Sequence, residues 1–417
     1  MQPNMRSCLF AISLTLLIPA ITASAENWPE FRGPDGSGLS QATNLPVEFA
    51  EGQNIRWKTA IHGKGWSSPV IWEDQIWLTT ATEDGHELYA VCIDRQNGTL
   101  VHNIQVFKTE NPRFCHPTNS YASPTPVIEA GRVYVHFGSY GTACLDSSSG
   151  EILWTRRDLP CNHWRGPGSS PVIDEDRLMV AYDGFDLQYM VALDKKTGQT
   201  SWKQDRNIDY GTDNGDRKKA YSTAALVEVS GRRQLVSPSA TETISYDPAT
   251  GKVLWRVRHG GMNAAIRPLF GNGLLYIAAG SGSSSMIAVR PDGNGDITNS
   301  HIEWSLGKGV PKRPAPVLAG KRMYMVDDVG IATCLNAENA EIIWQSRVGG
   351  SYRSSPILAD GRLYCFTLEG ESHVLATGDE YKLLATNRLD DGCQASPAAV
   401  GKTLYVRTTK HLYAIGK

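Results

Sequence analysis

The sequence predicts an all-β protein, a single eight-bladed β-propeller of four-stranded antiparallel blades. Three observations support this prediction. One segment recurs eight times, strand and turn patterns fill each repeat, and the two ends of the chain supply complementary parts of one blade. A closed ring of repeats also explains how 417 residues can form one folded unit without a linker.

Each repeat begins with Ser-Pro or a related dipeptide, and an aromatic residue follows eight residues after the proline. The repeats lie about 40 to 57 residues apart. Pro171 reaches Met179 at the same step, and Ala224 takes the place of proline in a longer repeat. The other pairs are Pro69/Trp77, Pro126/Tyr134, Pro268/Tyr276, Pro316/Tyr324, Pro356/Tyr364 and Pro397/Tyr405.

Short strands and tight turns alternate inside a repeat. In the seventh repeat, residues 354–358 and 362–366 predict two strands around the turn Asp360-Gly361. In the third repeat, residues 189–193 predict a third strand, and a fourth begins at Thr200. Between them lies an Asp-Lys-Lys-Thr-Gly hairpin loop, residues 194–198, in which Asp bonds its own backbone and Gly takes a positive φ.

A tryptophan recurs at the start of the fourth strand, as Trp57, Trp154, Trp202, Trp255, Trp304 and Trp344. His102 takes this place in the first repeat. We interpret this column as packing between wedge-shaped blades, because a large ring supplies apolar area that one blade lacks.

The ends of the chain predict how the ring closes. The last repeat, residues 395–415, contains three strands and stops before a fourth. Residues 54–58, ahead of the first repeat, supply a strand with its own Trp57. We therefore expect an N-terminal strand to complete the last blade and remove its exposed edge.

The first 25 residues have the features of a signal peptide. A basic start is followed by an apolar run over residues 9–21, and Ala23-Ser24-Ala25 matches a cleavage site. The run is too short to span a bilayer. We expect a periplasmic or secreted protein, soluble after cleavage near Ala25. The balance of 41 basic and 43 acidic residues argues against a nucleic-acid partner.

The repeats resemble the PQQ-type repeat family, the β-propellers related to quinoprotein alcohol dehydrogenases. Ala192, Asp194, Thr197, Gly198 and Trp202 match the family's tryptophan-docking motif. The resemblance covers nearly all of residues 54–417 and implies the propeller fold. The quinone enzymes of that family often carry a vicinal Cys-Cys disulfide or a haem domain, and this sequence has neither signature. Another branch, which assists outer-membrane barrel assembly, is a non-enzymatic interaction platform.

Residues 26–53 precede the propeller and are called the strap below. Their opening, Trp28 to Gly38, is similar to that of a secreted group of PQQ-like propellers. We expect the strap to cross the propeller with Trp28 and Phe31 anchored. A partner-binding tail is the alternative.

The loops that enter the innermost strands should converge on one mouth of the central channel. The residue three before each proline position would then line that mouth: Trp66, Ser123, Gly168, Tyr221, Ala265, Arg313, Arg353 and Gln394. Guanidinium groups and aromatic rings around one funnel can hold a planar anion. The candidate ligand-binding residues are Trp66, Arg165, Tyr221, Arg313, Arg353 and Gln394. A water-filled polar pore is the alternative.

Seven cysteines remain after cleavage, so at least one is unpaired or bridges to another chain. Cys115-His116 and Cys161-Asn162-His163 both precede a blade on one face. We expect a Cys115–Cys161 disulfide in an oxidising compartment. A zinc or copper site formed by these residues is the alternative.

Asp292, Asn294 and Asp296 place oxygen atoms at alternate positions, with Glu303 twelfth from Asp292. This spacing resembles a calcium loop, although Ile297 stands where such a loop has glycine. A glycine-rich hairpin turn explains the same residues.

Two functions are consistent with these patterns. The leading hypothesis is an exported binding or scaffolding propeller, with an unknown protein or a small anionic ligand at the funnel. The alternative is a quinoprotein-like oxidoreductase, for which PQQ and calcium, or another metal, would be the cofactors. A hydrolase or lyase on the funnel face is a third possibility, and no Ser/His/Asp set or pair of catalytic carboxylates stands out.

Overall fold

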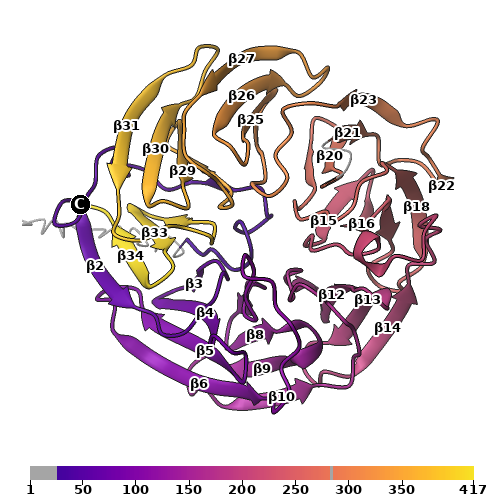
Figure 1. Ribbon diagram of the computed structural model, residues 1–417, viewed down its shortest axis with the longest axis horizontal. Helices are drawn as coiled ribbons and strands as arrows, with labels where there is room; N and C mark the ends of the chain where they lie inside the picture. The colour runs from indigo at the N-terminus through magenta and orange to yellow at the C-terminus, as the bar shows by residue number, and fades with distance from the viewer. Residues whose placement is uncertain (1–25, 282–284) are drawn as a thin grey trace, which may run out of the picture.

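The computed structural model describes residues 26–281 and 285–417. Over these residues the chain forms eight sheets arranged as a closed ring around a central axis (Figure 1). The predicted eight-bladed propeller is therefore confirmed. The predicted signal peptide lies outside the described residues.

The first four blades follow the order of the repeats, each running from the axis outward. Their strands are β3 (Val70–Trp72), β4 (Gln75–Ala81), β5 (Glu87–Asp94) and β6 (Leu100–Lys108); β7 (Val127–Glu129), β8 (Arg132–His136), β9 (Thr142–Asp146) and β10 (Ile152–Arg156); β11 (Val172–Asp174), β12 (Arg177–Asp183), β13 (Gln188–Asp194) and β14 (Thr200–Asp205); β15 (Ala225–Val229), β16 (Arg232–Pro238), β17 (Glu242–Tyr246) and β18 (Val253–Arg258).

The other four blades complete the ring. Their strands are β19 (Leu269–Gly271), β20 (Leu274–Ala278), β21 (Met286–Val289) and β23 (Ile302–Leu306); β24 (Val317–Ala319), β25 (Arg322–Val326), β26 (Ile331–Asn336) and β27 (Ile342–Arg347); β28 (Ile357–Ala359), β29 (Arg362–Phe366), β30 (Glu371–Ala376) and β31 (Leu383–Arg388); β32 (Ala398–Val400), β33 (Thr403–Arg407), β34 (His411–Ile415) and β2 (Ile55–Ala60). Two short 3₁₀ turns, Gly138–Tyr140 and Gly215–Arg217, and β22 (Gly295–Asp296) lie outside this scheme.

The proline-to-aromatic step corresponds to a fixed register between the two innermost strands. The residue after the proline pairs with the aromatic residue, as in Val70 with Trp77 and Ile357 with Tyr364. Cross-strand pairs of this kind stabilise a sheet through side-chain contact. A constant sequence spacing therefore reports a constant hairpin geometry.

Most of the recurring tryptophans reach the turn of the next blade. The Nε1 of Trp154 donates to the carbonyl oxygen of Lys195 at 3.0 Å. Gly198, at φ +72°, packs against the same ring, and a Cβ there would lie 2.6 Å from it. The positive φ and the close approach together explain glycine at this position.

The same contact recurs around the ring with two variations. Trp57, Trp202, Trp304 and Trp344 donate to carbonyl oxygens of Arg95, Pro248, Ala337 and Gly378 in the following blade. His102 contacts the Ser148 carbonyl in place of a tryptophan. Trp255 instead donates to Gln234 within its own blade, where β22 pairs with the outer edge of β18.

The core lies between blades. Buried apolar clusters combine side chains of neighbouring sheets, such as Val180 of the third blade with Tyr134 of the second. A larger cluster joins the last two blades, the first blade and the strap residues Trp28 and Phe49. Each blade therefore depends on its neighbours for apolar burial, which makes ring closure important for stability.

Closure occurs where the sequence predicts it. Strand β2 is antiparallel to β34, with Lys58 opposite Tyr413, and completes the last blade. Trp57 then donates to Arg95 in the first blade. The edge of β34 is covered by this pairing.

The strap passes over the middle of the ring, as the indigo trace shows (Figure 1). Trp28 is buried and exchanges backbone hydrogen bonds with Ile71 of the first blade. Strand β1 (Leu39–Ser40) pairs in parallel with β28 of the seventh blade. Residues 28–40 therefore connect the first blade with the seventh, two blades that are not neighbours in the ring.

Candidate functional site

A belt of hydroxyl groups lines the channel at the residue before six of the eight proline positions. The Oγ1 of Thr125 accepts a hydrogen bond from the backbone N–H of Ser68 in the preceding blade, at 2.9 Å. The same link continues through Ser170, Thr223, Ser355, Ser396 and Ser68. The Ser-Pro signature therefore ties neighbouring inner strands to one another.

The belt is interrupted in the fifth and sixth blades, where Arg267 and Ala315 occupy the hydroxyl position. The strap binds at this gap. Arg267 donates to the carbonyl of Phe31 and pairs with Glu30 at 3.0 Å. Arg32, itself fully buried, donates to the carbonyls of Pro316 and Ala315. These bonds fix the strap at one end of the channel.

All eight residues three before the proline positions line one cavity of about 180 Å³ inside the ring. The hydroxyl belt lines it too, together with Phe31 of the strap. The strap contacts residues one before the proline positions or later, whereas the mouth residues lie three before them, so the strap lies at the end of the cavity opposite the mouth. The channel is therefore a funnel whose floor includes Phe31.

A second cavity of about 220 Å³ forms the mouth of the funnel. It shares Tyr221, Arg313 and Arg353 with the inner cavity. The side chains that it adds are mainly polar or cationic, namely His116, Thr118, Arg165, Asn263, Ser281 and Lys312.

Two carboxylates near the mouth are engaged by cations. Asp216 pairs with Arg165 at 3.1 Å and also contacts Lys219. Asp328 pairs with Arg313 at 2.9 Å and accepts from the backbone N–H of Lys312. Each carboxylate thus faces more than one donor, which leaves positive charge at the mouth.

Arg353 carries part of that positive charge. Within the described residues its bonds go to neutral oxygens, Gln394 Oε1 at 3.1 Å and the Thr118 carbonyl at 3.4 Å. Burial, and then repulsion by Arg313, lower the pKa of Arg353. Burial and the charges of Arg165 and Arg353 likewise lower the pKa of His116. An anion that entered the mouth would relieve this repulsion.

The structure brings the predicted funnel residues together. Trp66 and Gln394 line the inner cavity, Arg165 lines the mouth, and Tyr221, Arg313 and Arg353 line both. The offset from each proline position predicts all of these residues except Arg165. Sequence reasoning missed Lys312 at the mouth and Phe31 at the floor. The dipeptide Lys312-Arg313 was a usable signal, whereas nothing local places Phe31 in the channel.

The predicted Cys115–Cys161 disulfide is not present, since both residues are free thiols in the structure. Cys161 is buried with its Sγ 3.8 Å from His163 Nδ1, whereas the Sγ of Cys115 faces the Arg165 carbonyl. The loop around residues 161–166 turns the two sulfur atoms toward different partners, so this expectation is corrected.

The alternative Cys/His metal site also lacks support from the geometry. His116 bonds to Thr118, while His163 faces Cys161 and accepts from the Ser139 N–H. Burial raises the pKa of Cys161 well above its usual value and lowers that of His163 to about 4. A neutral thiol beside a neutral imidazole is not an activated nucleophile. We assign this pair a packing role.

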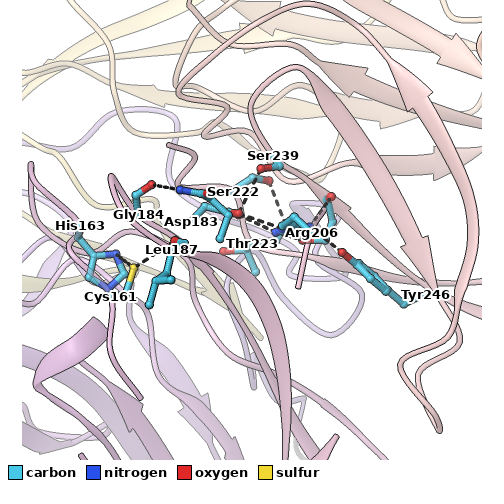
Figure 2. A network of polar contacts seen from close by, with 12 residues as sticks. Cys161, His163, Asp183, Gly184, Leu187, Arg206, Ser222, Thr223, Ser239 and Tyr246 are labelled. Atoms are coloured by element: carbon cyan, nitrogen blue, oxygen red, sulfur yellow. Dashed lines mark hydrogen bonds and ion pairs between the residues drawn. The ribbon is translucent and has the colours of Figure 1, made fainter. Parts of the chain in front are cut away.

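A buried ion pair lies next to the same loops (Figure 2). Arg206 donates through Nε and Nη2 to the two carboxylate oxygens of Asp183, at 2.9 and 2.6 Å. Ser239 of the fourth blade also donates to Asp183. The network fixes the end of β12 against the fourth blade, and the hairpin of residues 184–187 begins there.

The residues of the proposed calcium loop have separate protein partners. Asn294 accepts from Arg232, Asp296 accepts from the Thr298 N–H, and Asp292 lies 3.5 Å from His301. Residues 26–281 and 285–417 contain no group of three or more His, Cys, Asp or Glu side chains that could hold a metal ion. A hairpin turn accounts for this segment.

In the described part of the chain, no helix is both long enough and apolar enough to cross a membrane.

Comparison with known families finds a matching family model. It is described as outer membrane protein assembly factor BamB and matches residues 115–301 and 293–415. A curated relative from Yersinia pestis, outer membrane protein assembly factor BamB, is 25% identical over 241 residues. The alignment covers 57% of this chain and 57% of the relative.

Solved structures share the fold at low sequence identity. BamB from Moraxella catarrhalis has a TM-score of 0.61 and 12% identity, covering 86% of this chain and 99% of that one. A europium-containing methanol dehydrogenase has a TM-score of 0.71 and 10% identity, covering 94% and 91%. The quinohemoprotein alcohol dehydrogenase of Comamonas testosteroni has a TM-score of 0.66 and 11% identity, covering 95% and 82%. At these identities the likeness concerns the fold.

Proposed function

Because the chain belongs to the PQQ-type propeller family whose model is described as outer membrane protein assembly factor BamB, we propose that it is an exported binding module. Its funnel holds an anionic group of a small ligand or of a partner protein. The matched relative is named as an assembly factor, which favours a scaffolding role over catalysis.

The observation that carries the proposal is the charge of the funnel mouth. Arg165, Arg313 and Lys312 surround a cavity whose two nearby carboxylates are already paired. Arg353 bonds only to neutral oxygens among the described residues. A guanidinium in this situation can make bidentate bonds to a carboxylate.

The oxidoreductase alternative has less support from the residues. A planar quinone with carboxylates could contact Arg165 and Arg353, but its calcium would need a cluster of free oxygen ligands. Asp216 and Asp328, the carboxylates beside the mouth, are engaged by Lys219, Arg165 and Arg313. The residues present do not fit the metal.

Isothermal titration with citrate and with hexaglutamate tests the proposal. We expect both to bind, and Arg353→Gln to weaken binding at least tenfold. Arg388→Gln, at an exposed site on the outer strand β31, is the matched control and should leave affinity unchanged. Binding should weaken as salt concentration rises. If neither citrate nor hexaglutamate binds, the proposal is contradicted.

A second measurement addresses the alternative. The purified protein is mixed with the quinone and calcium, and dye reduction is recorded with alcohols and sugars as substrates. We expect no reduction above that of the Arg353→Gln variant. Turnover that depends on Arg353 would show that the protein is an oxidoreductase, and the proposal of a binding module would be wrong.

A further inference from the structure

Three large aromatic side chains lie exposed beside the funnel mouth. Phe114 is 57% exposed, Trp164 44% and Phe185 37%. The ring centroids of Phe114 and Trp164 are 6.0 Å apart, and those of Trp164 and Phe185 are 5.4 Å apart. We call these three residues the aromatic platform. Three adjoining exposed rings are unusual on a soluble surface and mark contact sites.

Trp164, the central ring, has a strained backbone. Its φ is +58°, in the left-handed region that bulky residues rarely adopt. Hydrogen bonds hold it there, from the Trp164 N–H to Asn162 Oδ1 at 3.0 Å and from the Arg165 N–H to the His163 carbonyl at 2.6 Å. The strain keeps an indole ring at the surface, which favours a role in contact over a role in packing.

Hydrogen bonds also tie the three loops of the platform together. Arg113, next to Phe114, donates to the Cys161 carbonyl at 2.9 Å. The N–H of Phe185 donates to the Asn162 carbonyl at 2.7 Å. The Phe185 hairpin follows the buried Asp183 of Figure 2. The rings are thus held in place before binding, which limits the entropy lost on contact.

The platform is continuous with the cationic mouth. His116 lies against the Phe114 ring at 6.4 Å and lines the mouth. Arg165 directly follows Trp164 and lines the same cavity. An extended segment could therefore place an apolar side chain on the platform and carboxylates in the funnel. Arg313 and Arg353 supply the complementary charge across the cavity.

We propose that the platform and the funnel mouth form one docking surface for an acidic peptide segment of a partner protein with a large apolar anchor. This inference rests on the proposed function, since the funnel supplies the charge. The anchor packs on Trp164, and the acidic residues that flank it bind Arg165 and Arg353. The funnel fixes the sign of the partner's charge, and the platform selects for the anchor.

Fluorescence anisotropy with three labelled hexapeptides, Phe-Glu-Glu-Phe-Glu-Glu, Ala-Glu-Glu-Ala-Glu-Glu and Phe-Lys-Lys-Phe-Lys-Lys, tests the inference. We expect the Phe/Glu peptide to bind at least tenfold tighter than either of the others. Trp164→Gly should abolish this advantage over the Ala/Glu peptide and leave the affinity for the Ala/Glu peptide unchanged. Glycine suits the positive φ at position 164, so this variant retains the fold.

Further variants separate the contact from stability. Trp164→Phe should keep most of the advantage, and Phe114→Ser should reduce it. Ile342→Ser removes an exposed apolar side chain from the outer strand β27 and should change nothing. Arg353→Gln should weaken binding of both acidic peptides.

The outcomes distinguish the two proposals. If neither acidic peptide binds, the funnel proposal itself fails. If both acidic peptides bind equally, or Trp164→Gly keeps the advantage, the funnel stands and the platform inference is wrong. Equal binding of the Phe/Lys peptide would refute the acidic partner. If sedimentation shows a dimer that the Trp164→Gly variant does not form, the platform binds a second copy of the chain, and the inference of an acidic partner segment is wrong.

Discussion

The guanidinium Nη1 of Arg407, in the last blade, donates a hydrogen bond to the carbonyl oxygen of Ser67, in the first blade, at 2.9 Å. It also donates to the carbonyl of Thr79. Arg407 is fully buried and, among the described residues, forms no ion pair, so its role is to satisfy carbonyls at the seam where the ring closes.

Arg407→Ala should therefore lower stability. The change leaves buried carbonyls without a donor and opens a cavity, which together cost about 3 kcal/mol. Urea unfolding measures this loss, with the exposed Arg388→Ala as control. A loss below about 0.5 kcal/mol, the range of ordinary surface changes, would show that the seam does not need this bond.

A pair of glycines tests the tryptophan contact between blades. Gly198 and Gly231 have similar positive φ, +72° and +77°, but only Gly198 faces a ring, that of Trp154. Both alanine variants should be strained by about 1 kcal/mol. Gly198→Ala should lose about 1–3 kcal/mol more because of overpacking. Equal melting temperatures of the two variants would argue against the contact.

His163 predicts a loss of stability in acid. Burial lowers its pKa to about 4 in the folded protein, from about 6.5 in the unfolded chain. Between these values the unfolded state binds the proton and the folded state does not. The His163 contribution to the free energy of unfolding is therefore complete above pH 6.5, and it falls by about 3 kcal/mol as the pH drops to 4.

His163→Gln should remove most of this dependence. Urea unfolding of the variant and the parent protein from pH 7 to pH 4 gives the two curves. We expect them to converge as the pH falls, because only the parent loses the His163 contribution. His136 and His259, whose pKa values burial also lowers, act equally in both proteins. Parallel curves would assign the acid sensitivity to other groups.

Deletion of residues 26–60 should destabilise the entire ring. The deletion removes β2, exposes the edge of β34 and breaks the bond from Trp57 to Arg95. It also removes strap residues such as Trp28 from the core. Calorimetry should show a melting temperature lower by more than about 10 °C. A chain starting at Ile61 that melts like the full protein would refute the closure.

Repeat spacing made most of the fold predictable. The step from Pro356 to Tyr364 recurs because one hairpin geometry recurs, so counting it gave eight blades and the position of the channel. The residues three before each proline were predictable as channel lining for the same reason. The incomplete last repeat and the early Trp57 were enough to predict closure.

Loop conformation was not predictable in this way. Cys161 and Cys115 are close to the same sector, but the turn at Trp164 directs Cys161 toward His163 and away from Cys115. A left-handed tryptophan has no local sequence signal. Because this turn could not be predicted, the disulfide prediction was wrong and the exposed aromatic platform was missed.

The sequence alone determined the architecture and the ring of side chains around the axis, because both depend on local spacing that repeats from blade to blade. Only the tertiary structure decided what fills the channel and what stays exposed. The strap places Phe31 in the funnel through Arg32 and Arg267, residues more than 200 positions apart. Such contacts follow from the net balance of burial and hydrogen bonding over the whole ring, and no single segment encodes them.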